Sequence, residues 1–390
     1  MRVWATVAVL CVRVISGSPS AQAQTYQLLL QFRAGVDGSA PWAGLVSDSS
    51  GNLYGTTSAD GAFDSGVVFR LNPAGKETVL HGFSGSGGDG EFPLAGLVRD
   101  AAGNLYGTTS DGGIYGGVCG GFGCGTVFKV DKTGKETTLY SFTGNPDGSN
   151  PYAGLVRDTA GNLYGTTFSG GAFGYGTVFR VDKSGKETVL YTFNPSNGDG
   201  ASSYGGLARD AAGNLYGTTY SGGSTSFGGT VFKLDTKGVE TVLYNFGVQN
   251  GDGLFPTGGL IRDSAGNLYG TAQSGGASGF GAVFKVDKNG KETVLYSFAS
   301  GTDGSTPFID GLLRDAKGNL YGMTSEGGAF SFGTIYKLDS AGKETVLHSF
   351  TGKGGKIPYG SLILDKQGNL YGATSEGGAH GGGVVFKLTP

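Results

Sequence analysis

The sequence has few charged residues, few histidines and few cysteines. Only 15% of its 390 residues are charged and the formal net charge is −3, so a strongly basic surface and ordinary nucleic-acid binding are excluded. Three histidines leave little room for His-based catalysis or a His-rich metal site. No P-loop, HExxH string or Ser-His-Asp grouping is present, and no predicted helix follows the Gly-x-Gly runs, which argues against a Rossmann site.

Long apolar runs are missing beyond the N-terminus. Arg2, the largely apolar run 3–15 and Ala21-Gln22-Ala23 are typical of a secretory signal peptide cleaved before Gln24. A membrane anchor is the alternative, but the run is shorter than the ~20 residues that cross a bilayer. We predict a signal peptide over 1–23 and one domain over 24–390, which has no membrane span and is secreted, periplasmic or on the cell surface.

Glycine is abundant, with 79 residues, about 20% against the usual ~7%. It lacks the three-residue period of collagen. The string Gly-Asn-Leu-Tyr-Gly instead occurs seven times, beginning at Gly51, Gly103, Gly161, Gly213, Gly266, Gly318 and Gly368. The spacing is 50–58 residues, so seven units fill the mature chain and leave no room for another domain.

Each unit contains four strand-like runs rich in β-branched and aromatic residues. In the second unit they are 96–99, 104–109, 126–130 and 136–142, joined by an Asp-Ala-Ala-Gly-Asn turn, a longer loop and an Asp-Lys-Thr-Gly-Lys turn. Nothing in the mature chain has the period of a helix. Four antiparallel strands in each of seven units predict an all-β fold, a seven-bladed β-propeller.

The two ends of the chain complement each other. The last unit stops after its third run, 384–388, whereas the chain begins with an orphan fourth run, Tyr26–Phe32, which aligns with Glu136–Phe142. We therefore predict that the N-terminal strand pairs antiparallel with 384–388 and completes the last blade. This closure removes a free sheet edge.

The unit also resembles a known family. Residues 96–109, 125–131 and 136–142 resemble the GloVer (Gloeo-Verruco) tandem repeat of exported bacterial proteins, and the resemblance covers residues 26–390. It implies export but no established activity. Members often carry C-terminal anchors, which we do not expect here because the chain ends at Pro390 inside the last blade. The repeat core is also similar to NHL-type and two-component sensor propellers, some of which bind ligands and some of which are lactonases. This second likeness concerns the fold.

The loops divide between two faces of the predicted propeller. The Asp-x-x-Gly-Asn and Asp-x-x-Gly-Lys turns are short and uniform, so we interpret their aspartates as structural. The opposite face carries longer, variable loops suited to binding. Its blade-connecting loops repeat Asp-Gly, in most blades followed by Pro, at Asp37, Asp89, Asp147, Asp199, Asp252 and Asp303. These aspartates either cap turns or form a ring of carboxylates near the central opening that attracts cations. We expect no cofactor; calcium would need help from backbone carbonyls.

Aromatic residues mark the same face. The residue after the Pro position is aromatic in five loops, at Trp42, Tyr152, Tyr204, Phe308 and Tyr359, and further Phe and Tyr residues stand among the glycines of the two–three loops. They either pack neighbouring blades together or form a platform for sugars or peptides. His81 and His348 replace a blade tyrosine and are interpreted as structural. Cys119 and Cys124 lie in the insertion of the second unit and predict a disulfide.

The functional prediction is an exported, non-catalytic binding or scaffold module that presents its aromatic, Asp-rich face to a glycan or an extracellular protein. We expect a monomer. The alternatives are a carbohydrate-active hydrolase or lyase that uses the loop carboxylates, and a purely structural surface or matrix protein.

Overall fold

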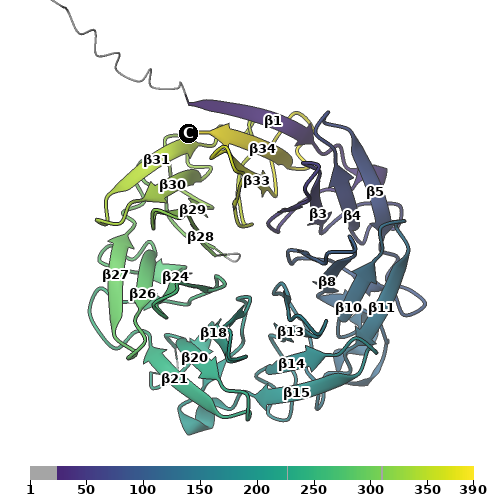
Figure 1. Ribbon diagram of the computed structural model, residues 1–390, viewed down its shortest axis with the longest axis horizontal. Helices are drawn as coiled ribbons and strands as arrows, with labels where there is room; N and C mark the ends of the chain where they lie inside the picture. The colour runs from purple at the N-terminus through teal and green to yellow at the C-terminus, as the bar shows by residue number, and fades with distance from the viewer. Residues whose placement is uncertain (1–23, 226, 309–310) are drawn as a thin grey trace, which may run out of the picture.

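The fold is a ring of seven four-stranded antiparallel sheets (Figure 1), seen in a computed structural model that describes residues 24–225, 227–308 and 311–390. The predicted seven-bladed all-β propeller is confirmed. Within these ranges, three short 3-10 segments interrupt the loops, η1 (Gly35–Asp37), η2 (Gly117–Phe122) and η3 (Pro195–Asn197). No helix in the described ranges is long and apolar enough to span a membrane. The predicted signal peptide, 1–23, lies outside the described residues.

Each blade runs from a short strand at the axis to a longer strand at the rim. Blade 1 comprises β2 (Val46–Ser47), β3 (Leu53–Thr57), β4 (Val67–Leu71) and β5 (Glu77–Gly82), and blade 2 comprises β7 (Val98–Arg99), β8 (Leu105–Thr109), β10 (Thr126–Val130) and β11 (Glu136–Ser141). Blade 3 comprises β12 (Val156–Arg157), β13 (Leu163–Thr166), β14 (Thr177–Val181) and β15 (Glu187–Thr192). Blade 4 comprises β17 (Ala208–Arg209), β18 (Leu215–Thr219), β20 (Thr230–Leu234) and β21 (Glu240–Asn245). Blade 5 comprises β23 (Ile261–Arg262), β24 (Leu268–Ala272), β26 (Ala282–Val286) and β27 (Glu292–Ser297). Blade 6 comprises β28 (Leu313–Arg314), β29 (Leu320–Thr324), β30 (Thr334–Leu338) and β31 (Glu344–Ser349). Blade 7 comprises β32 (Ile363–Leu364), β33 (Leu370–Thr374), β34 (Val384–Thr389) and β1 (Thr25–Gln31).

The innermost strands are shorter than the sequence predicts. In blade 2 the strand is Val98–Arg99 instead of 96–99. The Gly-Leu pair before it lines a central channel of about 230 Å³, whose wall is built largely from the Gly-Leu pairs at the same position of other blades. These residues lie at the axis, where no further strand is available to extend the ladder.

The apolar core lies between blades. The phenylalanine after each rim strand packs on the third strand of the next blade, with ring centroids 4.8–5.5 Å apart and edge-to-face geometry at all seven interfaces. Phe142 on Phe179 is one such pair, and both rings are fully buried. Since each pair joins two blades, these buried rings stabilise the packing of one blade on the next.

The last glycine of the repeated Gly-Asn-Leu-Tyr-Gly string makes room for these rings. Gly107 of β8 lies opposite Phe128 of β10. A Cβ atom at Gly107 would stand 2.6 Å from the Phe128 ring and 3.0 Å from Leu97. The same close approach occurs in every blade, which explains why glycine recurs at this position of the string.

We expect Gly107→Ala to lower the free energy of unfolding by about 1–3 kcal/mol, the usual cost of overpacking a core. Equilibrium denaturation of a chain of residues 24–390 measures this loss. Gly121→Ala is the matched control, because a Cβ atom at Gly121 has no neighbour within 4 Å. Equal stabilities of the two variants would contradict the packing argument.

The uniform turns are structural, as predicted. Asp100 accepts hydrogen bonds from the Asn104 backbone at 2.8 Å, the Asn104 amide at 2.8 Å and the Tyr106 hydroxyl at 3.0 Å. Partial burial raises the pKa of Asp100, but these hydrogen bonds together outweigh burial and hold the pKa below its ordinary value. Arg157 of the next blade lies 5.6 Å from the Tyr106 ring centroid, so the turn also ties neighbouring blades together.

The N-terminal strand closes the ring, as predicted. β1 pairs antiparallel with β34, from Thr25 opposite Thr389 to Gln31 opposite Val384. Figure 1 shows the purple β1 lying outside the yellow β34. Blade 7 is therefore built from both ends of the described chain.

Candidate functional site

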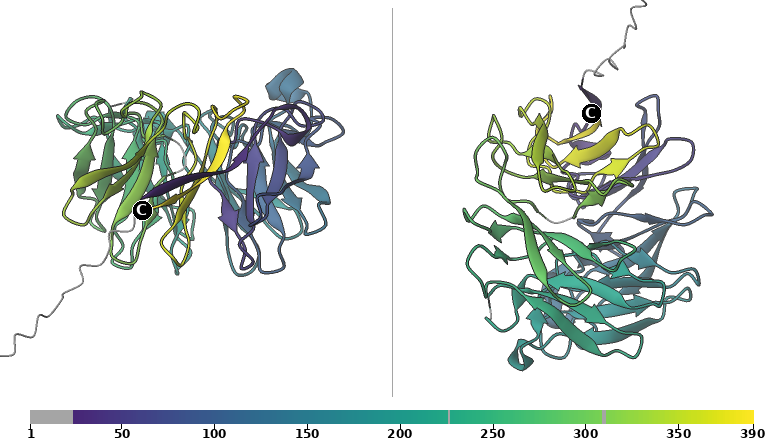
Figure 2. Two further views of the ribbon diagram at one scale, coloured as in Figure 1. Left: turned by 90° about the horizontal axis from the view of Figure 1, so that it is seen from above. Right: turned by 60° about the vertical axis from the view of Figure 1, so that its left-hand side comes forward.

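The blade-connecting loops and the two–three loops form one face of the ring. At each interface the connecting loop pairs with the two–three loop of the following blade. Three of these pairings are short sheets, β6 (Gly90–Glu91) with β9 (Asp111–Gly112), β16 (Gly200–Ala201) with β19 (Ser221–Gly222) and β22 (Gly253–Leu254) with β25 (Ser274–Gly275). The other four are single bridges, at Ser39, Ser149, Ser305 and Lys356. Figure 2, left, shows this loop face opposite the face of uniform turns.

Aromatic side chains gather around the axis on the loop face. Trp42 stacks on Tyr359, with ring centroids 4.5 Å apart, and Phe308 contacts Tyr359 at 5.0 Å. Tyr152 stacks on Tyr204 at 5.2 Å. The structure thus brings all five predicted aromatic residues into two groups, and Trp42, Tyr152, Tyr204 and Tyr359 each stand two residues before one that lines the central channel.

Three further aromatic residues and three carboxylates belong to this region. Phe168, Tyr220 and Phe255 extend the group of Tyr152 and Tyr204. Burial and the charge of Asp111 raise the pKa of Tyr152, and burial with the charges of Glu326 and Glu376 raises the pKa of Tyr359. Sequence reasoning overlooked these six residues. The Ser-Asp-Gly-Gly and Ser-Glu-Gly-Gly strings that open three of the two–three loops were a usable signal for the three carboxylates.

The predicted aspartates lie at separate blade interfaces. Asp147 accepts hydrogen bonds from the Tyr140 hydroxyl at 2.6 Å and the Thr143 backbone at 3.0 Å. Asp199, Asp252 and Asp303 repeat this pattern with their own rim-strand tyrosines, and Asp89 repeats it with His81. Asp37 lies in η1. These bonds are those of capped turns, and they hold the carboxylates beside the rim strands instead of around the central opening.

A glutamate of the next blade faces each of these aspartates. Burial, reinforced by the negative charge of Asp147, raises the pKa of Glu187 to about 7. Glu77, Glu240, Glu292 and Glu344 are raised to about 7 in the same way, by burial and the aspartate of the preceding loop. One carboxyl oxygen of each of these five glutamates is buried without a hydrogen-bond partner. The interfaces therefore contain carboxyl pairs that favour protonation.

The two–three loops place exposed phenylalanines at the edge of the loop face. Blades 1 to 6 each contribute one, with 43–75% of the residue exposed, at Phe63, Phe122, Phe173, Phe227, Phe280 and Phe330. These rings do not pack blades together, so the packing interpretation fails for them. Exposed aromatic rings at loop tips are available to a ligand.

A cleft on this face lies beside the disulfide loop of blade 2. Cys119 and Cys124 form the predicted disulfide, and their loop stands above its neighbours as the blue segment at the upper right of Figure 2, left. With the 170–174 loop of blade 3 it encloses a cleft of about 600 Å³. Asp111, Asn150, Phe122 and Phe173 line the cleft, and burial raises the pKa of Asp111. Amide, carboxyl and aromatic groups thus converge on one space.

The sequence profile of the Gloeobacter/Verrucomicrobia repeat matches residues 18–121, 114–314 and 309–390. The chain belongs to this family. The Gloeobacter/Verrucomicrobia repeat thus corresponds to the blades of the ring, and the predicted resemblance is confirmed. No curated protein matches the chain in sequence.

Solved propellers resemble this member of the Gloeobacter/Verrucomicrobia repeat family in fold. The extracellular domains of BT3049 and BT4673 from B. thetaiotaomicron, each assigned to a hybrid two-component system, match at TM-score 0.58 with 14% and 11% identity, covering 94% and 93% of this chain and 41% and 39% of those chains. PorZ, a surface component of the type-IX secretion system of Porphyromonas gingivalis, matches at TM-score 0.53 and 17% identity, covering 92% and 47%. The chain spans less than half the length of these three proteins.

Proposed function

We propose that the protein is an exported, non-catalytic binding propeller that holds a glycan in the cleft beside the disulfide loop. The cleft carries the proposal, because Phe122 and Phe173 offer faces for sugar rings while Asp111 and Asn150 offer hydrogen-bonding groups. Its volume of about 600 Å³ is that of a small-ligand site. The disulfide supports export, because such bonds persist in oxidising compartments. The likeness in fold to extracellular propeller domains agrees with a location outside the cytoplasm.

A protein ligand is the second candidate. The ring of six exposed phenylalanines extends far beyond the cleft, and separate aromatic anchors suit a broad protein surface. A hydrolase or lyase has less support, because the loop carboxylates first considered for acid–base work are bonded within their own interfaces.

Polysaccharide binding tests the proposal. The mature chain, 24–390, is applied to immobilised bacterial and plant polysaccharides, and both retention and release of new reducing ends are measured. We expect retention without release. Phe173→Ala removes one ring from the cleft and should weaken binding about tenfold, as for an aromatic contact at the centre of a site.

Phe330→Ala is the matched control, since Phe330 and Phe173 are 55% and 54% exposed but only Phe173 lines the cleft. An equal loss of polysaccharide binding in Phe173→Ala and Phe330→Ala would place the site on the exposed phenylalanines of the two–three loops and favour the protein ligand. A loss of binding in Trp42→Ala or Tyr152→Ala alone would place the site at the two groups of aromatic residues around the axis. New reducing ends would contradict a non-catalytic function, and no retention at all would leave a protein-binding or structural function.

A further inference from the structure

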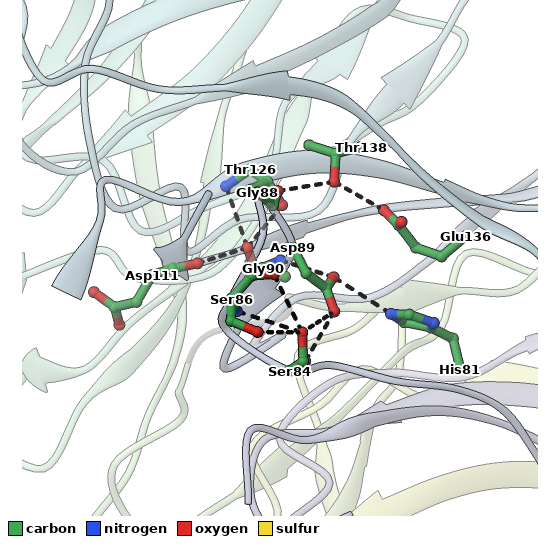
Figure 3. Close-up of polar contacts among 11 residues, drawn as sticks. His81, Ser84, Ser86, Gly88, Asp89, Gly90, Asp111, Thr126, Glu136 and Thr138 are labelled. Atoms are coloured by element: carbon green, nitrogen blue, oxygen red, sulfur yellow. Dashed lines mark hydrogen bonds and ion pairs between the residues drawn. The ribbon is translucent and has the colours of Figure 1, made fainter. Parts of the chain in front are cut away.

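One blade interface differs from the others in the groups that it brings together. Between blades 1 and 2, the ring of His81 from β5, the carboxylate of Asp89 from the following loop and the carboxylate of Glu136 from β11 converge (Figure 3). The three side chains are each partly buried, and their ligand atoms all lie within 4.8 Å of one another. Sequence reasoning interpreted His81 as a structural residue, because it stands where other blades have a tyrosine.

The neighbours of these side chains hold them in place. Asp89 Oδ2 accepts hydrogen bonds from the Ser84 backbone at 2.8 Å and the Ser84 hydroxyl at 3.0 Å, and Oδ1 lies 3.3 Å from His81 Nε2. Glu136 accepts a bond from the Thr138 hydroxyl at 3.2 Å. Contacts of this kind orient metal ligands in proteins.

The other interfaces provide internal comparisons. At four of them a tyrosine stands in place of His81, and its hydroxyl group donates a hydrogen bond to the aspartate. These tyrosines are Tyr140, Tyr191, Tyr244 and Tyr296. A neutral phenol that donates to the carboxylate adds no nitrogen ligand. His348 occupies the same position in blade 6, but there Gly354 replaces the aspartate and Tyr26, in place of the glutamate, stacks on the imidazole at 3.9 Å. Within the described residues, His81 alone meets both carboxylates.

We propose that His81, Asp89 and Glu136 form a binding site for a divalent transition-metal ion, with Zn²⁺ the best match. One imidazole nitrogen and two carboxylate oxygens are ligands that zinc accepts, and water completes the coordination. Tetrahedral zinc holds its ligand atoms roughly 3.4 Å apart, so small side-chain rotations bring the three groups onto one ion. A neutral imidazole with two carboxylates also balances the ion's charge. The ion links blade 1 to blade 2 close to the loop face.

Metal titration of the mature chain tests the proposal after treatment with a chelator. Zn²⁺ binding is measured by calorimetry, and Co²⁺ binding by its visible absorbance. We expect one ion per chain and a melting temperature that rises with Zn²⁺ concentration. His81→Tyr should weaken binding at least about tenfold and abolish the thermal shift. This variant gives blade 1 the residue that four other blades already carry beside the same aspartate, so it should fold.

A converse variant tests the same geometry by gain of binding. Tyr140→His sets an imidazole beside Asp147 and Glu187 and should raise the number of bound ions from one to two. His380→Ala removes a loop histidine and should leave the ion bound. Absence of Zn²⁺ and Co²⁺ binding in the unaltered chain would overturn the proposal. So would binding that survives His81→Tyr and disappears in His380→Ala. Neither result bears on the glycan cleft, whose test uses other residues.

Discussion

A chain that lacks β1, starting at Arg33 instead of Gln24, should fail to fold into a closed ring and should aggregate. The deletion exposes the whole edge of β34, which β1 covers from Val384 to Thr389, and free sheet edges associate with other chains. It also removes Phe32, which is 1% exposed and packs edge-to-face on Phe69 of blade 1 at 5.2 Å. Losing such a ring alone costs about 3–5 kcal/mol, against a total stability of about 5–15 kcal/mol. Circular dichroism and size-exclusion chromatography measure the result.

Two further variants separate closure from loss of residues. Phe32→Ala should fold with reduced stability, whereas Phe63→Ala, at an exposed ring, should not change stability. A circular permutant that starts at Gly35, joins Leu388 to Tyr26 through a copy of the 131–135 turn and ends at Ala34 keeps the β1–β34 pairs from Tyr26 to Gln31. It should melt close to the natural chain. A deletion mutant with an unchanged melting temperature would contradict closure.

The fold could be predicted from the sequence because it repeats local signals. Each Asp-x-x-Gly-Asn turn carries its own hydrogen-bonding groups, as Asp100, Asn104 and Tyr106 show. The orphan strand at Tyr26–Phe32 revealed the closure because six complete copies of the fourth strand were available for comparison. The lengths of the innermost strands were overestimated, because their ends depend on the central channel and not on local composition.

The candidate sites were less predictable because they form between repeats. The cleft needs the disulfide loop of blade 2 and the 170–174 loop of blade 3 together, and no spacing in the sequence relates these two loops. The sequence identified the aspartates but not where their carboxylates point, because five of the six bind a tyrosine or histidine seven or eight residues earlier in the chain. Glu136 and its equivalents drew no attention because they open regular strands.

These glutamates should make the protein more stable in mild acid than at neutral pH. Burial and the facing aspartates raise the pKa of Glu77, Glu187, Glu240, Glu292 and Glu344 from the ordinary 4.5 to about 7. Between pH 4.5 and about 7 the folded chain therefore holds protons that the unfolded chain has released. Stability then falls as pH rises through this window. Aspartates such as Asp100, whose pKa is lowered despite partial burial, remove stability only below about pH 4.

Calorimetric melting between pH 4 and 8 measures this dependence. Because the glutamates are only half-buried, solvent screening reduces their combined effect to about 3 kcal/mol, or a fall of roughly 5 °C from pH 5 to pH 8. Replacing all five by glutamine keeps their shape and removes the titration, so the melting temperature should become nearly flat across the window. Glu326→Gln, at an exposed loop glutamate, should retain the full dependence. A natural chain that melts higher at pH 8 than at pH 5 would show that these carboxyl pairs are already ionised in the folded state and tolerated at the blade interfaces.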